Sequence, residues 1–213
     1  MIRVDGVSRS FGGNVAVEDV TFAIEPGEVV GLPGPNGSGK STTIRVLLGL
    51  LRPAAGSASI TRPAGYLPEH LQPYDGLTVR AYLRFACATR RIARDAIDGA
   101  LADAGVADLA RRPIGRLSKG QRQRVGLAQA VLGSPATIVL DEPTASLDPA
   151  QVVEVRALVR RRASAGAAVL VSTHLLAEAA AVCDRVVVLS AGRVVAIEPP
   201  GPDLEQRFLQ LTR

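Results

Sequence analysis

The chain has 213 residues, 47% of them hydrophobic and 21% charged, with a formal net charge of +5. This length suits one domain with a sizeable core, and two cysteines are too few for a disulfide framework or a zinc site, so a reducing compartment such as the cytosol is expected. Arginine clusters such as Arg160-Arg161-Arg162 have no interleaved aromatic residues, so nucleic-acid binding is not expected, and neither a signal peptide nor a membrane span is predicted.

The N-terminal third begins with a strand pattern. Val20, Phe22 and Ile24 alternate with polar or small residues, which predicts a half-buried strand in an antiparallel sheet. After a Pro-Gly turn, the run 28–32 reads as a buried strand, and residues 42–51 continue as a helix. A glycine-rich loop joins this strand to this helix.

The remainder divides into a helical part and an alternating part. Helices are predicted at 79–90, 94–104, 119–132, 150–162, 175–182 and 203–211, and strands at 136–140, 167–171 and 185–189. Alternating strands and helices indicate an α/β fold with a parallel sheet flanked by helices. We predict one domain, with a nucleotide-binding core at 1–68 and 134–198, a helical insertion at 69–133 and a short C-terminal helix within 199–213.

The glycine-rich loop has the pattern of a P-loop that binds nucleotide triphosphates. Glycines allow backbone N–H groups to converge on phosphates at a helix N-terminus, the lysine neutralises the β and γ oxygens, and the last serine has the hydroxyl that such loops place on Mg²⁺. An ordinary glycine turn would not require the final Lys-Ser pair. The expected ATP-binding residues are Gly34, Asn36, Gly37, Ser38, Gly39, Lys40, Ser41 and Thr42.

A second phosphate-site element is the apolar run 137–140, which is followed by Asp141 and Glu142. Asp141 suits a direct or water-mediated hold on Mg²⁺, and Glu142 can polarise the water that attacks the γ-phosphate. Strands often end in solvated carboxylates, so this pattern alone is weak evidence for a phosphate site. Together with the P-loop upstream it is strong evidence.

The segment Leu117-Ser118-Lys119-Gly120-Gln121 resembles the LSGGQ signature of ABC ATPases, and Ser118 lies 23 positions before Asp141, as in that family. Ser118 would begin a helix and Gly120 would expose backbone, which makes a second anion-binding terminus. The resemblance implies a head-to-tail dimer in which Ser118, Gly120 and Gln121 of each copy close the ATP site of the other. The alternative, an ordinary capped helix, explains Ser118 but not the order of the motifs.

Three further residues match the family in sequence order. Asp148 resembles the D-loop residue that couples the two sites across the dimer, and His174 resembles the switch histidine that reaches the γ-phosphate beside Glu142. Phe11 matches the aromatic residue that stacks on adenine, a place more often held by tyrosine. A lone histidine is more often a core residue than a catalytic one, and an isolated phenylalanine can equally be a core residue, so only the family order favours the functional reading.

Two positions depart from the family pattern. Glu69 stands where the family usually has glutamine, in the loop between the ATP site and the helical insertion, and we expect it to join Ser41 and Asp141 in holding Mg²⁺; Gln72 is the alternative for this role. Pro33 precedes the P-loop where an aliphatic residue is usual, which requires that its missing N–H is not needed in the sheet.

Three segments, 66–70, 77–80 and 126–130, are similar to ATPases of ABC-2-type exporters, including the gliding-motility and copper-site-maturation branches. The resemblance implies an ATPase, with Glu142, His174 and Lys40 catalytic and ATP and Mg²⁺ as cofactors, that drives an integral membrane permease from the cytoplasmic face of the cell membrane. The alternatives are an ABC ATPase that acts on the ribosome or on DNA, and a non-catalytic nucleotide-binding module. The transported substrate does not follow from the sequence.

Overall fold

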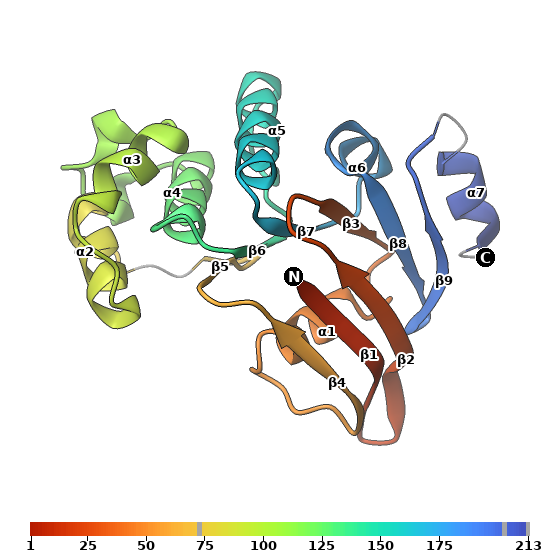
Figure 1. Cartoon of the computed structure of the whole chain (residues 1–213). Coiled ribbons are helices and arrows are strands. Elements are labelled where there is room, and N and C mark those ends of the chain that lie inside the picture. Colours follow the sequence, from red (N-terminus) through yellow and green to blue (C-terminus); the bar gives the residue numbers. More distant parts are fainter. Residues whose placement is uncertain (72–73, 202–203, 212–213) are drawn as a thin grey trace.

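Two sheets organise the protein (Figure 1), whose computed structural model describes residues 1–71, 74–201 and 204–211. The larger sheet has the strand order β5-β6-β7-β3-β8-β9, and all its neighbouring strands are parallel except β8 and β9. Its strands are β3 (Val29–Pro33), β5 (Ala64–Leu67), β6 (Thr137–Asp141), β7 (Ala168–Thr173), β8 (Arg185–Ser190) and β9 (Arg193–Glu198). Every residue of β3, β6 and β7 is buried, as expected for strands covered on both faces.

The smaller sheet is antiparallel, with the order β2-β1-β4. It consists of β1 (Ile2–Phe11), β2 (Asn14–Ile24) and β4 (Ala55–Ile60). Helix α1 (Lys40–Leu47) lies between the two sheets, and its Ile44 and Leu47 belong to one apolar cluster with Val4 of β1 and Leu32 of β3. The N-terminus of α1 is therefore fixed at the end of the central strand β3, where the P-loop begins.

The other face of the large sheet is covered by helices. Helices α4, α5 and α6 contact β5, β6, β7 and β3, and α7 packs beside α6 (Figure 1). The remaining helices α2 and α3 lie with α4 at one side of the molecule, between β5 and β6 in sequence. The bounds are α2 (Val79–Arg90), α3 (Ala96–Asp103), η1 (Ala107–Leu109), η2 (Ile114–Arg116), α4 (Lys119–Val131), α5 (Pro149–Ser164), α6 (Leu176–Val182) and α7 (Leu204–Leu211).

The structure has the expected fold class, and the differences from the sequence-based elements are local. The helix expected at 42–51 begins at Lys40 and ends at Leu47, because Gly49 adopts a φ of 74° just beyond it. Strands β1, β4, β5 and β9 were not predicted. Gln72, the alternative to Glu69, and Asp203, the expected first residue of the last helix, lie outside the described residues. Within the described ranges, no helix is both long and apolar enough to cross a membrane.

Pro33 is the last residue of the central strand β3. It pairs with Thr173 of β7, whereas the register with β8 ends two residues earlier, at Gly31 and Val186. A proline at this position ends the strand after the β8 ladder has stopped, so that ladder loses no donor. The chain is then free to turn into the P-loop.

Candidate functional site

The P-loop turns between β3 and α1 through positions that only glycine can occupy. A Cβ on Gly34 would collide with the hydroxyl of Ser38 and lie 2.7 Å from the carbonyl oxygen of Leu189. Gly39, the N-cap of α1, has a φ of 105°, and a Cβ there would lie 2.8 Å from the carbonyl oxygen of Ala16. Among the described residues no side chain caps α1, so its N-terminal N–H groups face the loop and suit an anion.

Lys40 is the buried cation of the loop, with 9% of its surface exposed. Its Nζ donates to the carbonyl oxygens of Gly34 at 2.6 Å and of Pro35 at 3.1 Å. Burial lowers the pKa of Lys40, and the nearby carboxylates Glu142, Asp141 and Glu69 act in the opposite direction. Within the part of the chain that the structure describes, the buried hydroxyl of Ser38 has no hydrogen-bond partner. A cation and an unsatisfied hydroxyl thus face a cavity that fits phosphate oxygens.

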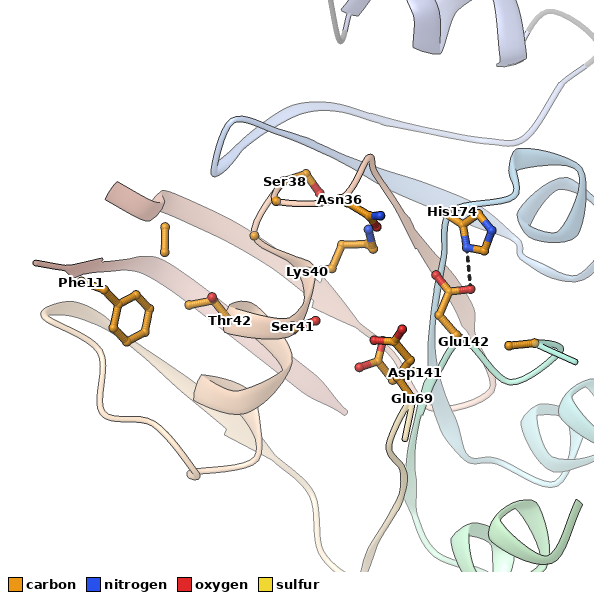
Figure 2. A pocket seen from close by; sticks show the side chains of 14 residues that line it. Phe11, Asn36, Ser38, Lys40, Ser41, Thr42, Glu69, Asp141, Glu142 and His174 are labelled. Carbon is orange, nitrogen blue, oxygen red and sulfur yellow. Dashed lines mark hydrogen bonds and ion pairs between the residues drawn. The ribbon is translucent and has the colours of Figure 1, made fainter. Parts of the chain in front are cut away.

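Three carboxylates lie opposite the loop (Figure 2). Asp141 ends β6 and accepts a hydrogen bond from the hydroxyl of Ser172 in β7, the neighbouring strand. Its pKa is raised, first by burial and then by Glu69 and Glu142, against the lowering effects of Ser172 and Lys40. A charged Asp141 therefore favours an added cation at this place, and the hard oxygen donors suit Mg²⁺.

Glu142 and His174 form a pair at the end of β6 and β7. The Nδ1 of His174 lies 2.9 Å from Oε2 of Glu142, and the Glu142 side chain is 11% exposed against 56% for that of His174. The backbone of Glu142 has a φ of 51°, in the left-handed region that non-glycine residues rarely adopt. A carboxylate held by a histidine at the rim of a cavity can orient and polarise a water molecule.

Phe11 marks the other end of the cavity (Figure 2). It ends β1 at a two-residue turn, Gly12-Gly13, whose positive φ values of 53° and 85° fit a tight hairpin. The ring is 46% exposed, and the guanidinium carbon of Arg9 lies 5.2 Å from its centroid. An exposed ring at the cavity wall suits stacking of a base rather than a place in the core.

These groups line one cavity of about 590 Å³, a size typical of small-ligand sites. The predicted residues that line it come from β1, the P-loop, α1, the loop after β5, the end of β6 and the end of β7. They are Phe11, Asn36, Gly37, Ser38, Gly39, Lys40, Ser41, Thr42, Glu69, Asp141, Glu142 and His174. Gly34 is not among the lining residues, but its carbonyl oxygen accepts from the Nζ of Lys40.

The signature residues and Asp148 do not line this cavity. Ser118 caps α4, where its hydroxyl accepts from the N–H of Gln121 and the Gln121 side chain accepts from the N–H of Ser118. Asp148 likewise caps α5. A Cβ on Gly120 would lie 3.0 Å from the carbonyl oxygen of Ser146, so the two segments are neighbours at one exposed surface. Within one chain, they therefore lie outside the candidate nucleotide cavity.

Two polar side chains beside the site were missed by sequence reasoning. Ser172 hydrogen-bonds Asp141, and Gln123 of α4 donates from Nε2 to the carbonyl oxygen of Glu142 at 2.9 Å. Ser172 lies two residues before His174 at the end of an apolar run, which is a signal that could have been used. Gln123 gives no such signal, because its partner is 19 positions away in a different element.

Comparisons with known proteins agree with these features. A family model described as ABC transporter matches residues 17–145. The uncharacterized ABC transporter ATP-binding protein YxlF of Bacillus subtilis (strain 168) is 37% identical over 91% of this chain and 69% of its own length. The zinc import ATP-binding protein ZnuC of Jannaschia sp. (strain CCS1) is 38% identical over 89% of this chain and 79% of its own. The Nod factor export ATP-binding protein I of Rhizobium johnstonii is 35% identical over 97% of this chain and 72% of its own length.

Solved structures show the same similarity. An ATP-binding subunit of an ABC transporter superposes with a TM-score of 0.92 at 30% identity, over 100% of both chains. The dimeric ATP-binding cassette MJ0796, in a post-hydrolysis state bound to ADP and Pi, has a TM-score of 0.85 at 25% identity, over 94% of this chain and 99% of that one.

Proposed function

The chain belongs to the ABC transporter family and is an ATPase, and on this premise we propose that it powers a separate membrane permease of the ABC-2 exporter type. The observation that carries the proposal is the single cavity that unites Lys40, Asp141 and the Glu142–His174 pair. The exporter assignment rests on the resemblance of the segments 66–70, 77–80 and 126–130. One relative is named for zinc import and another for Nod factor export, so these names do not favour either direction.

At the phosphate end, the proposed roles follow from position. Lys40 binds the β and γ oxygens, and the N–H groups at the start of α1 bind the phosphate chain. Glu142 holds the attacking water, and His174 orients the carboxylate through its Nδ1. We assign Mg²⁺ to Ser41, Asp141 and Glu69; when bound, it neutralises charge that develops on the transferred phosphoryl group.

The signature surface supports a head-to-tail dimer. Ser118, Gly120 and Gln121 at the start of α4, together with Asp148 at the start of α5, lie outside the cavity of their own chain. We propose that they bind the ATP held by a second copy. One nucleotide is then enclosed between two chains at each site.

We propose that the permease docks on the helical insertion (residues 69–133). This segment has eleven Lys and Arg and six Asp and Glu, so it accounts for the whole formal charge of +5, and the rest of the chain is neutral. Tyr74 and Phe85, 63% and 49% exposed, form an edge-to-face pair with ring centroids 5.9 Å apart. An exposed aromatic pair within a basic segment suits an acidic loop on the cytoplasmic side of a permease.

The proposal is tested by affinity purification of the tagged chain from detergent extract, after co-expression with a multi-span protein from the same operon. We expect this integral membrane protein to co-purify and to stimulate phosphate release. Co-purification of RNA or DNA would support an ATPase that acts on the ribosome or on DNA. Binding of ATP without phosphate release would indicate a non-catalytic module.

Phe11→Ala is expected to raise KM for ATP about tenfold, because one base–aromatic stack contributes about 1.4 kcal/mol. Phe11→Tyr retains the ring and is expected to leave KM within about twofold. Steady-state phosphate release measures both. Val15→Ala serves as the control, since Val15 is an exposed apolar residue of the next strand outside the cavity. An unchanged KM in Phe11→Ala would remove Phe11 from the ATP site.

Glu69→Ala is expected to raise the Mg²⁺ concentration for half-maximal ATPase activity about tenfold, since a carboxylate ligand would be lost. Direct Mn²⁺ titration by electron paramagnetic resonance, with ATP bound, should show the same loss of affinity. Permease-stimulated activity should fall as well. His70→Ala is the control, because His70 is exposed beside Glu69 and does not line the cavity. If the metal affinity and the stimulation were both unchanged, the role proposed for Glu69 would be abandoned.

A further inference from the structure

Gln123 lies in α4, one and a half turns after the signature serine that begins this helix. It is 7% exposed, and its Nε2 donates to the carbonyl oxygen of Glu142 at 2.9 Å in a buried hydrogen bond. A buried polar side chain that makes such a bond fixes the group it contacts, because loss of either partner leaves the other unsatisfied.

Glu142, whose carbonyl accepts this hydrogen bond, has an unusual backbone conformation. Glu142 has a φ of 51°, which L-residues rarely adopt and which persists only where the surroundings enforce it. Its N–H donates to the carbonyl oxygen of Ser172 at 3.1 Å, and its own carbonyl accepts from Ala145 at 3.2 Å and from Gln123. Gln123 supplies the shortest of these three bonds, and it comes from the helical insertion.

The same helix touches the segment after Glu142 a second time. Gly120 approaches the carbonyl oxygen of Ser146 so closely that a Cβ would lie 3.0 Å from it. Helix α4 therefore contacts both ends of the segment 142–146. The helix that begins at the signature serine is therefore also bonded to Glu142, a carboxylate-bearing residue of the cavity.

We propose that Gln123 is a positioning residue for ATP hydrolysis: its amide holds the Glu142 peptide in the left-handed conformation that aims the carboxylate at His174 and at the attacking water. The proposal rests on the role proposed for Glu142. Gln123 does not line the cavity, so it acts through Glu142 and not on ATP. Its loss should therefore alter the chemical step and leave nucleotide binding intact.

The first test compares Gln123→Met with Gln129→Met in the full-length chain. Methionine keeps the length of the side chain and removes the donor. We expect kcat to fall about tenfold in Gln123→Met, with KM for ATP within about twofold, because a misplaced general base costs rate and not affinity. Gln129 lies on the same helix and accepts from the hydroxyl of Tyr82, away from the cavity, so Gln129→Met should keep kcat.

A pH profile separates positioning from a merely structural role. In Gln123→Glu, a protonated carboxyl can donate to the Glu142 carbonyl, whereas the ionised form cannot and adds a negative charge. We expect the ratio of the kcat of this variant to that of the unsubstituted protein to rise severalfold as the pH falls from about 8.5 to about 6. A buried glutamate can titrate in this range.

The outcomes are distinct. If Gln123→Met keeps kcat while Glu142→Gln loses it, the positioning role is wrong and the proposed function stands. If Glu142→Gln keeps kcat, the catalytic assignment on which this inference rests is wrong. A flat pH ratio in Gln123→Glu, or an equal loss of kcat in Gln129→Met, would also overturn the positioning role.

Discussion

Glu142→Gln is expected to lower kcat for ATP hydrolysis by roughly 10²- to 10⁴-fold, the contribution typical of a general base, and to leave ATP binding intact. The carboxylate accepts from His174 at 2.9 Å at the rim of the cavity, and an amide of the same shape cannot accept a proton from water. ATP that is not hydrolysed stays in the site, so a head-to-tail dimer should persist. Phosphate release and light scattering with Mg²⁺ and ATP measure the two effects.

Glu154→Gln is the matched control for this loss of a carboxylate. Glu154 is 61% exposed on α5 and pairs with Arg124 at 2.6 Å, outside the cavity. Its replacement should change neither kcat nor the association state. If Glu142→Gln hydrolysed ATP at the unsubstituted rate, Glu142 would not be the base, and another group of the cavity would have to orient the water.

The sequence predicted the parts of the fold that carry continuous or periodic apolar residues. The buried strands β3, β6, β7 and β8 and the helix α2 were found within a residue or two of their ends. The strand β4 was missed because Ala-Gly-Ser-Ala-Ser-Ile has a single bulky apolar residue, at its last position, and four of its six residues are exposed. Pairing with β1 holds this segment in a sheet, and such pairing is a tertiary effect that local propensity does not report.

The site divides in the same way. Lys40, Asp141 and Glu142 could be predicted because each stands at a fixed offset from a glycine loop or a strand end. The left-handed backbone of Glu142 and its bond from Gln123 could not, since no local pattern marks the φ of 51° and the bond joins two segments that are 19 positions apart. Motifs predict which residues belong to the site, whereas the orientation of their side chains depends on contacts between distant segments.

Lys40→Met is expected to weaken ATP binding about 100-fold or more, because a buried charge-assisted contact to two phosphate oxygens is lost. Equilibrium titration with a fluorescent ATP analogue measures this effect. Arg45→Met removes another cation from α1, but Arg45 is exposed outside the cavity and its loss should leave affinity unchanged. Affinity within about threefold of the unsubstituted protein in Lys40→Met would contradict the assignment of the phosphate site.

Lys40→Met is expected to weaken ATP binding but not to lower the stability of the nucleotide-free protein. Burial lowers the pKa of Lys40, so the folded state binds this proton less tightly than the unfolded state does. Below that pKa, keeping the charge therefore costs folding free energy, and the cost is relieved as pH rises through the folded pKa. Without nucleotide, Lys40→Met should melt at or above the Tm of the unsubstituted protein at pH 7. A lower Tm would mean that the hydrogen bonds from Nζ to Gly34 and Pro35 outweigh the burial of the charge. A higher Tm with lost ATP binding would identify Lys40 as a residue kept for the phosphate and not for the fold.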